Sequence, residues 1–279
     1  KMRVLFLGTA AYEGHPNVFC DCDNCRKVRE ASADNFRLTS AVLVNDDLLI
    51  DFGPNIMAGA QKTGSTLFNV RTLLITHSHS DHLYLPNFGY RMDRYNASYE
   101  RLSPMSVLAN STVLSLISDS VYFDPDKTIL LMAEAYKETV LNDYSVIPIP
   151  AVHKVKEGEQ ALLFLIKKKG KSFFYATDTG PLDEFSLKLI KSFLDSPLDL
   201  VAIDSTLGFM KEVTFPYHQT AEQVVSTVET MRKNGIMDDT TKIYAHHFSH
   251  YPNPTQGELE RFYVRFGIAV AYDGLSLEI

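Results

Sequence analysis

His77-Ser78-His79-Ser80-Asp81-His82 is the stretch of this 279-residue sequence that decides the fold, and it directly follows the apolar run Leu73-Leu74-Ile75-Thr76. The apolar run is typical of a buried strand. The imidazoles and the carboxylate that follow cannot all be buried without partners, because each unpaired group would cost several kcal/mol. At the irregular end of a strand they can instead converge on a cation, since imidazole and carboxylate are ligands of zinc, manganese and iron. The stretch therefore predicts a metal site.

Further candidate ligands follow predicted strands later in the chain. They are His153, Asp178 and His247. A catalytic ion needs about three protein ligands and one open position. The cluster and these later residues together therefore predict two ions.

Short apolar strands broken by turns alternate with helices along the chain. The predicted strands are Arg3–Leu7, Ser40–Val44, Leu48–Asp51, Thr72–Thr76, Ser145–Pro150, Ala161–Lys167, Ser172–Ala176, Leu200–Ile203, Lys242–Ala245 and Ala269–Ala271. The predicted helices are Asn55–Lys62 and Thr220–Lys233, with Thr220 as a possible cap. The basic run Lys167–Lys171 is expected to be a solvated hairpin turn. This alternation predicts an α/β architecture in which helices cover sheets.

Composition and charge exclude several classes of protein. Apolar residues make up 45% of the chain, which permits a sizeable core. The net charge of −7 gives no general attraction to nucleic acid, so we expect no nucleic-acid partner. No apolar run approaches the ~18 residues of a membrane span, and the N-terminal run is too short for a signal peptide. We expect a cytoplasmic protein with no membrane attachment.

The chain has three cysteines, Cys20, Cys22 and Cys25. An odd and crowded set without a secretion signal is a poor disulfide framework. Thiolates are strong zinc ligands, and a closed tetrahedral site needs a fourth ligand. We expect that ligand to be His250, three residues after His247, which predicts a structural zinc site on the Cys20–Cys25 loop. The alternative is a surface loop of unliganded thiols.

The candidate ligands occur in a characteristic order: the motif H-x-H-x-D-H, a lone His, an Asp after a strand and a C-terminal His. In this order the sequence resembles the metallo-β-lactamase superfamily over nearly the whole chain. The resemblance implies a single hydrolase domain, residues 1–279, with a four-layer αββα sandwich, and homodimers are common in this superfamily. It also implies that Asp178 bridges two ions. The other ligands of the first ion would be His77, His79 and His153, and those of the second Asp81, His82 and His247. Leu48–Gly53 resembles the early family motif, whose Asp supports the ligand loop.

Two local patterns narrow the resemblance. The cysteine cluster with His247-Phe248-Ser249-His250 resembles the PhnP branch, the phosphoribosyl cyclic phosphate phosphodiesterases. The His-Phe-Ser triplet also resembles the tRNase Z enzymes, which favours His247 over His246 as the catalytic ligand. His218-Gln219-Thr220 resembles the segment that carries a catalytic His in phosphodiesterases of this superfamily.

These resemblances imply a metal-dependent phosphodiesterase that acts on a small phosphate diester, either cyclic or open-chain. A hydroxide bridging two zinc or manganese ions would attack phosphorus. Asp81 and His218 are the catalytic candidates, and His218 would stabilise the transition state or protonate the leaving oxygen. The chain departs from the family after His82, where the usual glycine is missing. In the segment that follows, Arg91 and Arg94 are either a phosphate clamp or ordinary surface arginines.

Four alternatives stay open. A tRNA 3′-processing endonuclease shares the histidine patterns, but the chain is acidic and has no obvious basic arm. A thioester or lactone hydrolase would keep the metal ligands without needing His218. A di-iron redox protein would call for Glu in place of His79. A non-catalytic metal-binding scaffold should have lost ligands, and this sequence has the complete set.

Overall fold

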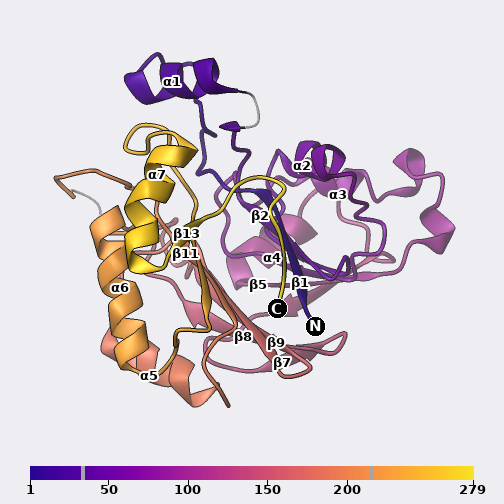
Figure 1. The fold of residues 1–279 in the computed structure, drawn as a ribbon. Coiled ribbons are helices and arrows are strands. Elements are labelled where there is room, and N and C mark those ends of the chain that lie inside the picture. Colours follow the sequence, from indigo (N-terminus) through magenta and orange to yellow (C-terminus); the bar gives the residue numbers. More distant parts are fainter. Residues whose placement is uncertain (33–34, 214–215) are drawn as a thin grey trace.

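The computed structural model describes residues 1–32, 35–213 and 216–279. In this part of the chain two seven-stranded sheets lie face to face (Figure 1). The first sheet has the order β14 (Ser276–Glu278), β1 (Arg3–Gly8), β2 (Ala41–Val44), β3 (Leu48–Ile50), β4 (Thr72–Leu74), β5 (Met105–Ala109) and β6 (Thr128–Met132). The second has the order β13 (Ala269–Val270), β12 (Lys242–His246), β11 (Leu200–Asp204), β10 (Lys171–Ala176), β9 (Leu162–Lys168), β8 (Tyr144–Pro150) and β7 (Thr139–Leu141).

Successive side chains of a strand point to opposite faces of its sheet, so the buried apolar side chains form three clusters, one between the sheets and one under the helices on each side. In β1, Val4 and Phe6 face the second sheet, whereas Leu5 and Leu7 face the helices outside the first sheet. Helices cover the outer faces of both sheets (Figure 1). Over the first sheet lie α2 (Ile56–Thr63) and α4 (Ser111–Ser118), and over the second lie α5 (Glu184–Ser192), α6 (Ala221–Lys233) and α7 (Gln256–Tyr263). The expected four-layer αββα sandwich is therefore confirmed.

Parallel pairing brings several strand ends to one edge of the sandwich. In the first sheet β3, β4 and β5 are parallel neighbours, and in the second β10, β11 and β12 are. The β8 strand runs in the same direction as β10, because both are antiparallel to β9. The residues that follow the carboxyl ends of these strands are therefore placed near one another, as in other open α/β sheets.

The predicted ranges agree with the structure to within about two residues at each end, but the sequence analysis did not predict the helices α4, α5 and α7 or the strands β5, β6, β7 and β14. Thr220 forms a capping box with Gln223 at the start of α6, as its position before the helix indicated. The β9–β10 hairpin pairs Lys168 with Lys171 across its turn, so the prediction for the basic run is confirmed. Its lysines are near carboxylates: Lys171 Nζ lies 2.6 Å from Asp199 Oδ1.

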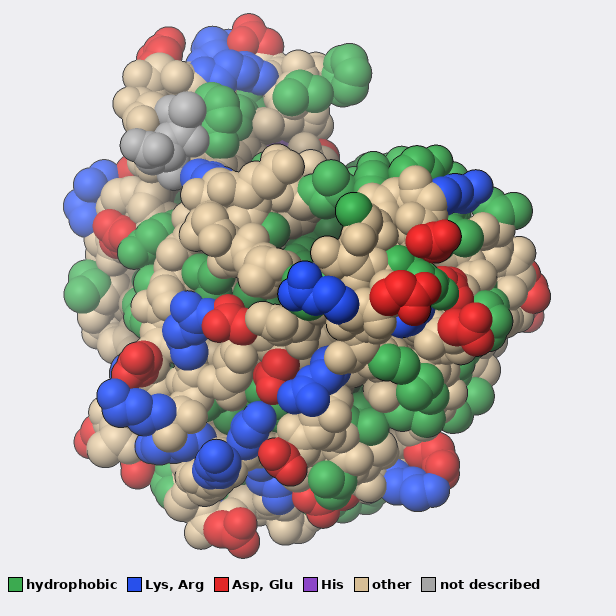
Figure 2. Space-filling model, turned by 90° about the vertical axis from the view of Figure 1, so that its right-hand side faces the viewer, with side chains coloured by type: hydrophobic (Ala, Val, Ile, Leu, Met, Phe, Trp, Pro, Cys, Tyr) green, Lys and Arg blue, Asp and Glu red, His purple; other side chains and the backbone are tan. Residues whose placement is uncertain are grey.

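One local prediction was wrong. The segment Cys20–Cys25 is not a loop throughout, because helix α1 (Asp23–Ala31) begins after Cys22 and includes Cys25. This helix projects from the body of the molecule above α7 (Figure 1), and Figure 2 shows the same projection from the side of the first sheet. In the described parts of the chain, no helix combines the length and the apolar character that a membrane crossing requires.

Candidate metal centre

The structure brings the predicted ligands of the two ions together. Each side chain in two groups offers a ligand atom within 4.8 Å of the others in its group. The first group is His77, His79, His153 and Asp178, and the second is Asp81, His82, Asp178 and His247. Asp178 is shared, and its Oδ2 lies 3.3 Å from His77 Nε2 and 3.1 Å from His82 Nε2. These two groups have the same members as the two ligand sets that the family resemblance implies.

Unusual backbone conformations turn three residues of the centre away from their strands. Asp51, Asp178 and His247 follow β3, β10 and β12, and their φ angles are 63°, 66° and 61°. The left-handed region costs a non-glycine residue about 1–3 kcal/mol, and such residues concentrate at functional sites. At these strained turns the side chains no longer alternate between the two faces of the sheet. The three side chains point instead into the edge of the sandwich.

A buried relay orients His77 and His82. Asp51 Oδ1 accepts hydrogen bonds from Thr76 N and Thr76 Oγ1, both at 2.9 Å, and Thr76 Oγ1 lies 3.0 Å from His77 Nδ1. Asp51 Oδ2 lies 2.7 Å from His82 Nδ1. Because the Nδ1 atoms are engaged in this way, both rings turn Nε2 toward Asp178. A Cβ at Gly53 would lie 1.8 Å from the Asp81 carbonyl oxygen, so only glycine permits this approach to the ligand loop.

A second relay of the same form orients His247, and the sequence did not reveal it. Thr206 Oγ1 lies 2.8 Å from His247 Nδ1 and donates to Asp204 Oδ2 at 2.9 Å. Asp204 is fully buried at the end of β11, and its carboxylate also accepts from the backbone N–H groups of Thr179, Thr206 and Gln219. With these donors Asp204 serves to position other side chains. In the sequence, the one sign of this role was that Asp204 stands at the end of a buried strand.

Glu159 is another supporting residue that the sequence analysis missed. Its carboxylate accepts from Ser78 N at 2.8 Å and from Ser78 Oγ at 2.6 Å, and it also accepts from Asn110 Nδ2 at 3.1 Å. Ser78 lies between the ligands His77 and His79. Glu159 therefore fixes the ligand loop to the second sheet's β8–β9 connection.

The neighbouring histidines 246 and 247 point in different directions. His246 is fully buried, with Nδ1 at 3.0 Å from Thr177 Oγ1 and Nε2 at 3.2 Å from the Gly8 carbonyl oxygen. Both of its ring nitrogens are engaged away from Asp178. His247 Nε2 lies 3.8 Å from Asp178 Oδ2, so the geometry places His247 in the centre.

The centre has the character of a cation site. Among the described residues, His82 Nε2 and His247 Nε2 are buried and make no hydrogen bond, although Asp178 Oδ2 lies 3.1 and 3.8 Å away from them. Unpaired buried atoms of this kind are costly unless something binds them. Burial would raise the pKa of Asp178, but His247, His218 and the other imidazoles lower it well below its usual range. Burial also lowers the pKa of His153 to about 3, so this ring is neutral. Burial would lower the pKa of His82 as well, but Asp81 and Asp51 raise it well above its usual range, so a divalent ion that binds His82 would displace a proton.

His218 lies beside the ligands, just before α6. Its Nδ1 is 3.0 Å from Asp178 Oδ1 and 3.3 Å from Asp204 Oδ2, and its ring stacks on His247 at a centroid distance of 6.1 Å. Burial would lower the pKa of His218, but the bonds to Asp178 and Asp204 raise it to about 10. The ring is therefore held as a proton donor at the edge of the centre.

A pocket of about 350 Å³ opens onto the ligands, and we call it the metal pocket. It is lined by Ala11, Tyr12, Glu13, His79, Ser80, Asp81, His153, Asp178, Thr206, His218, His247 and Ser249. This lining contains no lysine or arginine among the described residues. Arg91 and Arg94 lie elsewhere: Arg91 donates to the Ser103 carbonyl oxygen, and Arg94 lies over the Tyr95 ring. Neither arginine is a phosphate clamp in this pocket.

The three cysteines and His250 form a second cluster of candidate ligands. Their ligand atoms lie within 4.8 Å of one another, and His250 Nδ1 is 3.3 Å from Cys25 Sγ and 3.9 Å from Cys22 Sγ. Burial raises the pKa of the Cys22 thiol, but hydrogen bonds from the Cys25 backbone and from His250 outweigh it and lower the pKa to about 7. A thiolate is thus accessible near neutral pH, as zinc binding requires.

Comparison with known proteins agrees with this architecture. The family described as "Beta-lactamase superfamily domain" matches residues 47–247. That is most of the chain, so the chain belongs to the β-lactamase superfamily. The expected superfamily is thereby confirmed, and the metal-dependent hydrolase that it implies fits the two groups of candidate ligands. No curated protein is similar enough in sequence to count as a match.

Solved structures share the fold at low sequence identity. A diphosphatase from the PhnP family superposes with a TM-score of 0.76 at 22% identity, over 100% of this chain and 98% of the other. Zinc-bound PqqB from Methylobacterium extorquens gives 0.71 at 16% identity, over 99% and 100% of the two chains. The short form of human tRNase Z gives 0.62 at 16% identity, over 99% of each chain. At these identities the similarity establishes the fold alone.

Proposed function

We propose that this protein is a phosphoric diester hydrolase that uses two divalent metal ions. The observation that carries the proposal is the position of Asp178, which lies between two groups of three further ligands and within 3.0 Å of His218. Two ions held by one shared carboxylate form a clamp for a phosphoryl group. The PhnP-family diphosphatase and human tRNase Z, which share the fold, are named for reactions at phosphorus.

The chain's own residues define the two metal positions. His77, His79 and His153 would hold one ion, and Asp81, His82 and His247 the other, with Asp178 between them. The bound ions would supply an activated water and offset the charge on phosphoryl oxygens. Imidazole and carboxylate ligands suit zinc and manganese. The Asp51 and Asp204 relays keep the Nε2 atoms of His77, His82 and His247 available for the ions.

His218 is the residue that directs this centre toward phosphodiesters. It lines the metal pocket and is hydrogen-bonded through Nδ1, on the side of Asp204. Burial would lower the pKa of His218, but Asp178 and Asp204 together favour the charged imidazole and so hold the proton on this ring. A protonated His218 can donate to the departing alkoxide or stabilise charge on phosphorus. Thioester hydrolysis expels a thiolate, a better leaving group that needs no such donor.

The charge of the metal pocket favours a substrate with a single negative charge. Its described lining contains carboxylates, Glu13 among them, and no lysine or arginine to offset further negative charge. A phosphate diester carries one negative charge, whereas a monoester carries nearly two at neutral pH. We therefore expect the diester to bind and the monoester product to leave.

We also propose a structural zinc ion on Cys20, Cys22, Cys25 and His250. The cluster is linked to the metal pocket, because Glu13 Oε1 accepts from Ser249 Oγ at 2.5 Å and from His250 N at 3.2 Å. An ion there would fix the α1 projection to the loop that carries His247.

The test is hydrolysis of bis(p-nitrophenyl) phosphate by protein loaded with manganese or zinc, beside p-nitrophenyl phosphate as the monoester. We expect turnover of the diester to exceed that of the monoester. The His218→Gln variant should lose about 10²–10⁴-fold in kcat and keep its metal content, because His218 is a proton donor rather than a ligand. Fully metallated protein that cleaves thioesters or lactones and leaves the diester intact would contradict the proposal.

A further inference from the structure

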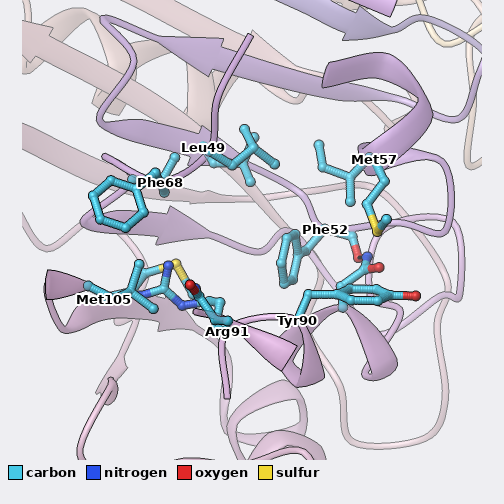
Figure 3. Close-up of a pocket in the computed structure, with 13 residues that line it drawn as sticks. Leu49, Phe52, Met57, Phe68, Tyr90, Arg91 and Met105 are labelled. Atoms are coloured by element: carbon cyan, nitrogen blue, oxygen red, sulfur yellow. Dashed lines mark hydrogen bonds between the residues drawn. The ribbon is translucent and has the colours of Figure 1, made fainter. Parts of the chain in front are cut away.

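A second cavity lies away from the metal ligands, on the helix-covered side of the first sheet (Figure 3). Its volume is about 290 Å³, and we call it the outer pocket. It is lined by Leu49, Phe52, Ile56, Met57, Leu67, Phe68, Val70, Asn87, Tyr90, Arg91, Asn96, Leu102 and Met105. None of these residues lines the metal pocket. The volume is at the lower end of the range for small-molecule sites.

The walls of the outer pocket are mostly apolar. Figure 3 shows Leu49, Phe68 and Met105 on one side and Phe52 with Met57 on the other. Leu49 and Met105 are fully buried members of the core beneath the helices. Transfer of an alkyl chain from water onto such walls is favourable by about 0.8 kcal/mol for each buried CH₂ group. The shape and chemistry fit a flexible apolar chain.

Arg91 gives the outer pocket a charged end. It is the one charged side chain of the described lining, and no carboxylate oxygen of the described residues lies within 4.0 Å of it. Its Nη2 donates to the Ser103 carbonyl oxygen at 2.9 Å, but its Nε is buried without a hydrogen-bond partner in the described chain. Burial lowers the pKa of Arg91 to about 10, so the guanidinium stays charged at neutral pH. A buried N–H that lacks a partner is costly unless a ligand accepts from it.

The two asparagines of the lining already have hydrogen-bond partners, and Asn96 Oδ1 accepts from Ser98 N at 2.9 Å. Asn87 Nδ2 donates to the carbonyl oxygens of Phe52 and Gly53 at 3.0 and 2.8 Å. Asn87 therefore holds the wall in shape, and Arg91 is left as the group that recognises charge. Arg101 adds positive charge near Phe68, since its Cζ lies 5.6 Å from the centroid of that ring.

We propose that the outer pocket binds a single-chain amphiphile with a singly charged anionic head, namely a medium-chain carboxylate. The alkyl chain would lie among Phe52, Phe68 and Met105, and the carboxylate would accept from Arg91 Nε. One unpaired cation at the end of an apolar cavity matches one negative charge at the end of an apolar chain. The site is independent of the reaction proposed for the metal centre.

The outer pocket shares one wall with the backbone that supports the metal ligands. Phe52 N donates to the His82 carbonyl oxygen at 2.7 Å, and Phe52 O accepts from Tyr84 N at 2.9 Å. An occupant would therefore rest against the segment that follows Asp51 without touching a ligand side chain. Binding can thus be measured on the intact protein whatever its substrate is.

The experiment is calorimetric titration of the full-length, metal-loaded protein with sodium decanoate, beside decyl phosphate and decyltrimethylammonium as probes of head-group charge. We expect saturable 1:1 binding of decanoate and at least tenfold weaker binding of the ammonium probe. The Arg91→Gln variant should bind decanoate about tenfold more weakly, because one charge-assisted hydrogen bond is lost. The control Arg94→Gln, in the same segment but outside the pocket lining, should bind like the original protein.

Leu67→Trp tests the cavity itself, since the larger side chain would fill it from the half-exposed wall. Circular dichroism spectra and melting temperatures identify variants that are folded. In folded protein we expect Leu67→Trp to abolish decanoate binding. The proposal is overturned by absence of saturable binding, by equal affinities of Arg91→Gln and Arg94→Gln, or by undiminished binding to Leu67→Trp. Tighter binding of decyl phosphate than of decanoate would overturn the assignment of the head group.

Discussion

Two threonines have matching roles at the scale of single residues. Thr76 connects Asp51 to His77, and Thr206 connects Asp204 to His247. In each relay a buried carboxylate accepts from a threonine hydroxyl, which in turn accepts from a histidine Nδ1. The arrangement fixes the tautomer of the imidazole and leaves Nε2 for a metal ion.

The relay through Thr206 predicts a specific loss of metal affinity. Thr206→Val removes the hydroxyl and keeps the shape, so His247 should be oriented less well and the second ion should bind about 10–100-fold more weakly. The matched control is Thr177→Val, whose hydroxyl contacts the neighbouring His246. Titration of the metal-free variants with zinc or manganese measures the affinity of each variant for the second ion. Equal weakening by the two variants would contradict the assignment of His247 as the ligand.

Sequence alone predicted ligands more readily than their supports. His77, His79, Asp81 and His82 form a dense motif, and such density of ligand types is rare in a polar loop. Asp204 and Glu159 are isolated carboxylates whose partners are distant in the sequence or are backbone groups. Asp204 is marked only by its place at the end of a buried strand, and no local pattern distinguishes Glu159 from an ordinary surface acid.

At the scale of elements, helix α1 was beyond reach of pattern reasoning. In this nine-residue helix the buried residues are Cys25 and Val28, and Cys22 at its start makes no capping hydrogen bond. The apolar stripe that identifies α6 is therefore absent. The cysteine cluster, rather than an apolar face, is what can hold this helix in place.

Loss of the cysteine cluster should release α1 without unfolding the sandwich. In Cys25→Ser we expect one zinc ion fewer per chain, and faster hydrogen exchange in residues 20–31 and in the His247–His250 loop. The reason is that the ion would be the main link between these segments. Phe19→Ser is the control, because Phe19 is 99% exposed and contributes no ligand. Unchanged zinc content in Cys25→Ser would show that the cluster is not a zinc site.

The turn between β13 and β14 contains a carboxylate that should make stability depend on pH. Asp273 accepts from Thr9 Oγ1 at 2.7 Å and from Leu38 N at 2.6 Å, and burial raises its pKa from 3.8 to about 6. The folded protein holds the proton of the Asp273 carboxyl more tightly than the unfolded chain does. The protonated carboxyl therefore makes its full contribution to the free energy of unfolding below pH 3.8. This contribution is lost as pH rises through 6.

Asp273→Asn removes this titration. Relative to the variant, the original protein should therefore lose free energy of unfolding between pH 4 and 7, by up to roughly 3 kcal/mol. Urea denaturation of both proteins at several pH values between these limits measures the difference. A difference that stays constant over this range would contradict the buried position of the carboxylate.

At the scale of the whole molecule, the metal centre joins the two sheets. His77, His79, Asp81 and His82 follow β4 of the first sheet, and Asp178 follows β10 of the second. The sandwich could be predicted through the resemblance of the ligand motif to a known superfamily. The sheet order could not, because pairs such as β1 with β14 join residues at opposite ends of the chain. Apolar alternation marks a strand but carries no information about its partner.

The central claim is that Asp178 lies between two metal ions. Anomalous diffraction from crystals of the zinc-loaded protein, recorded on both sides of the zinc absorption edge, tests it most directly. We expect two anomalous peaks flanking Asp178, one near His79 and one near His82, and a third among Cys20, Cys22, Cys25 and His250. The third peak serves as an internal control for zinc loading. Crystals in which the cysteine cluster is occupied, but only one peak or none lies beside Asp178, would contradict it.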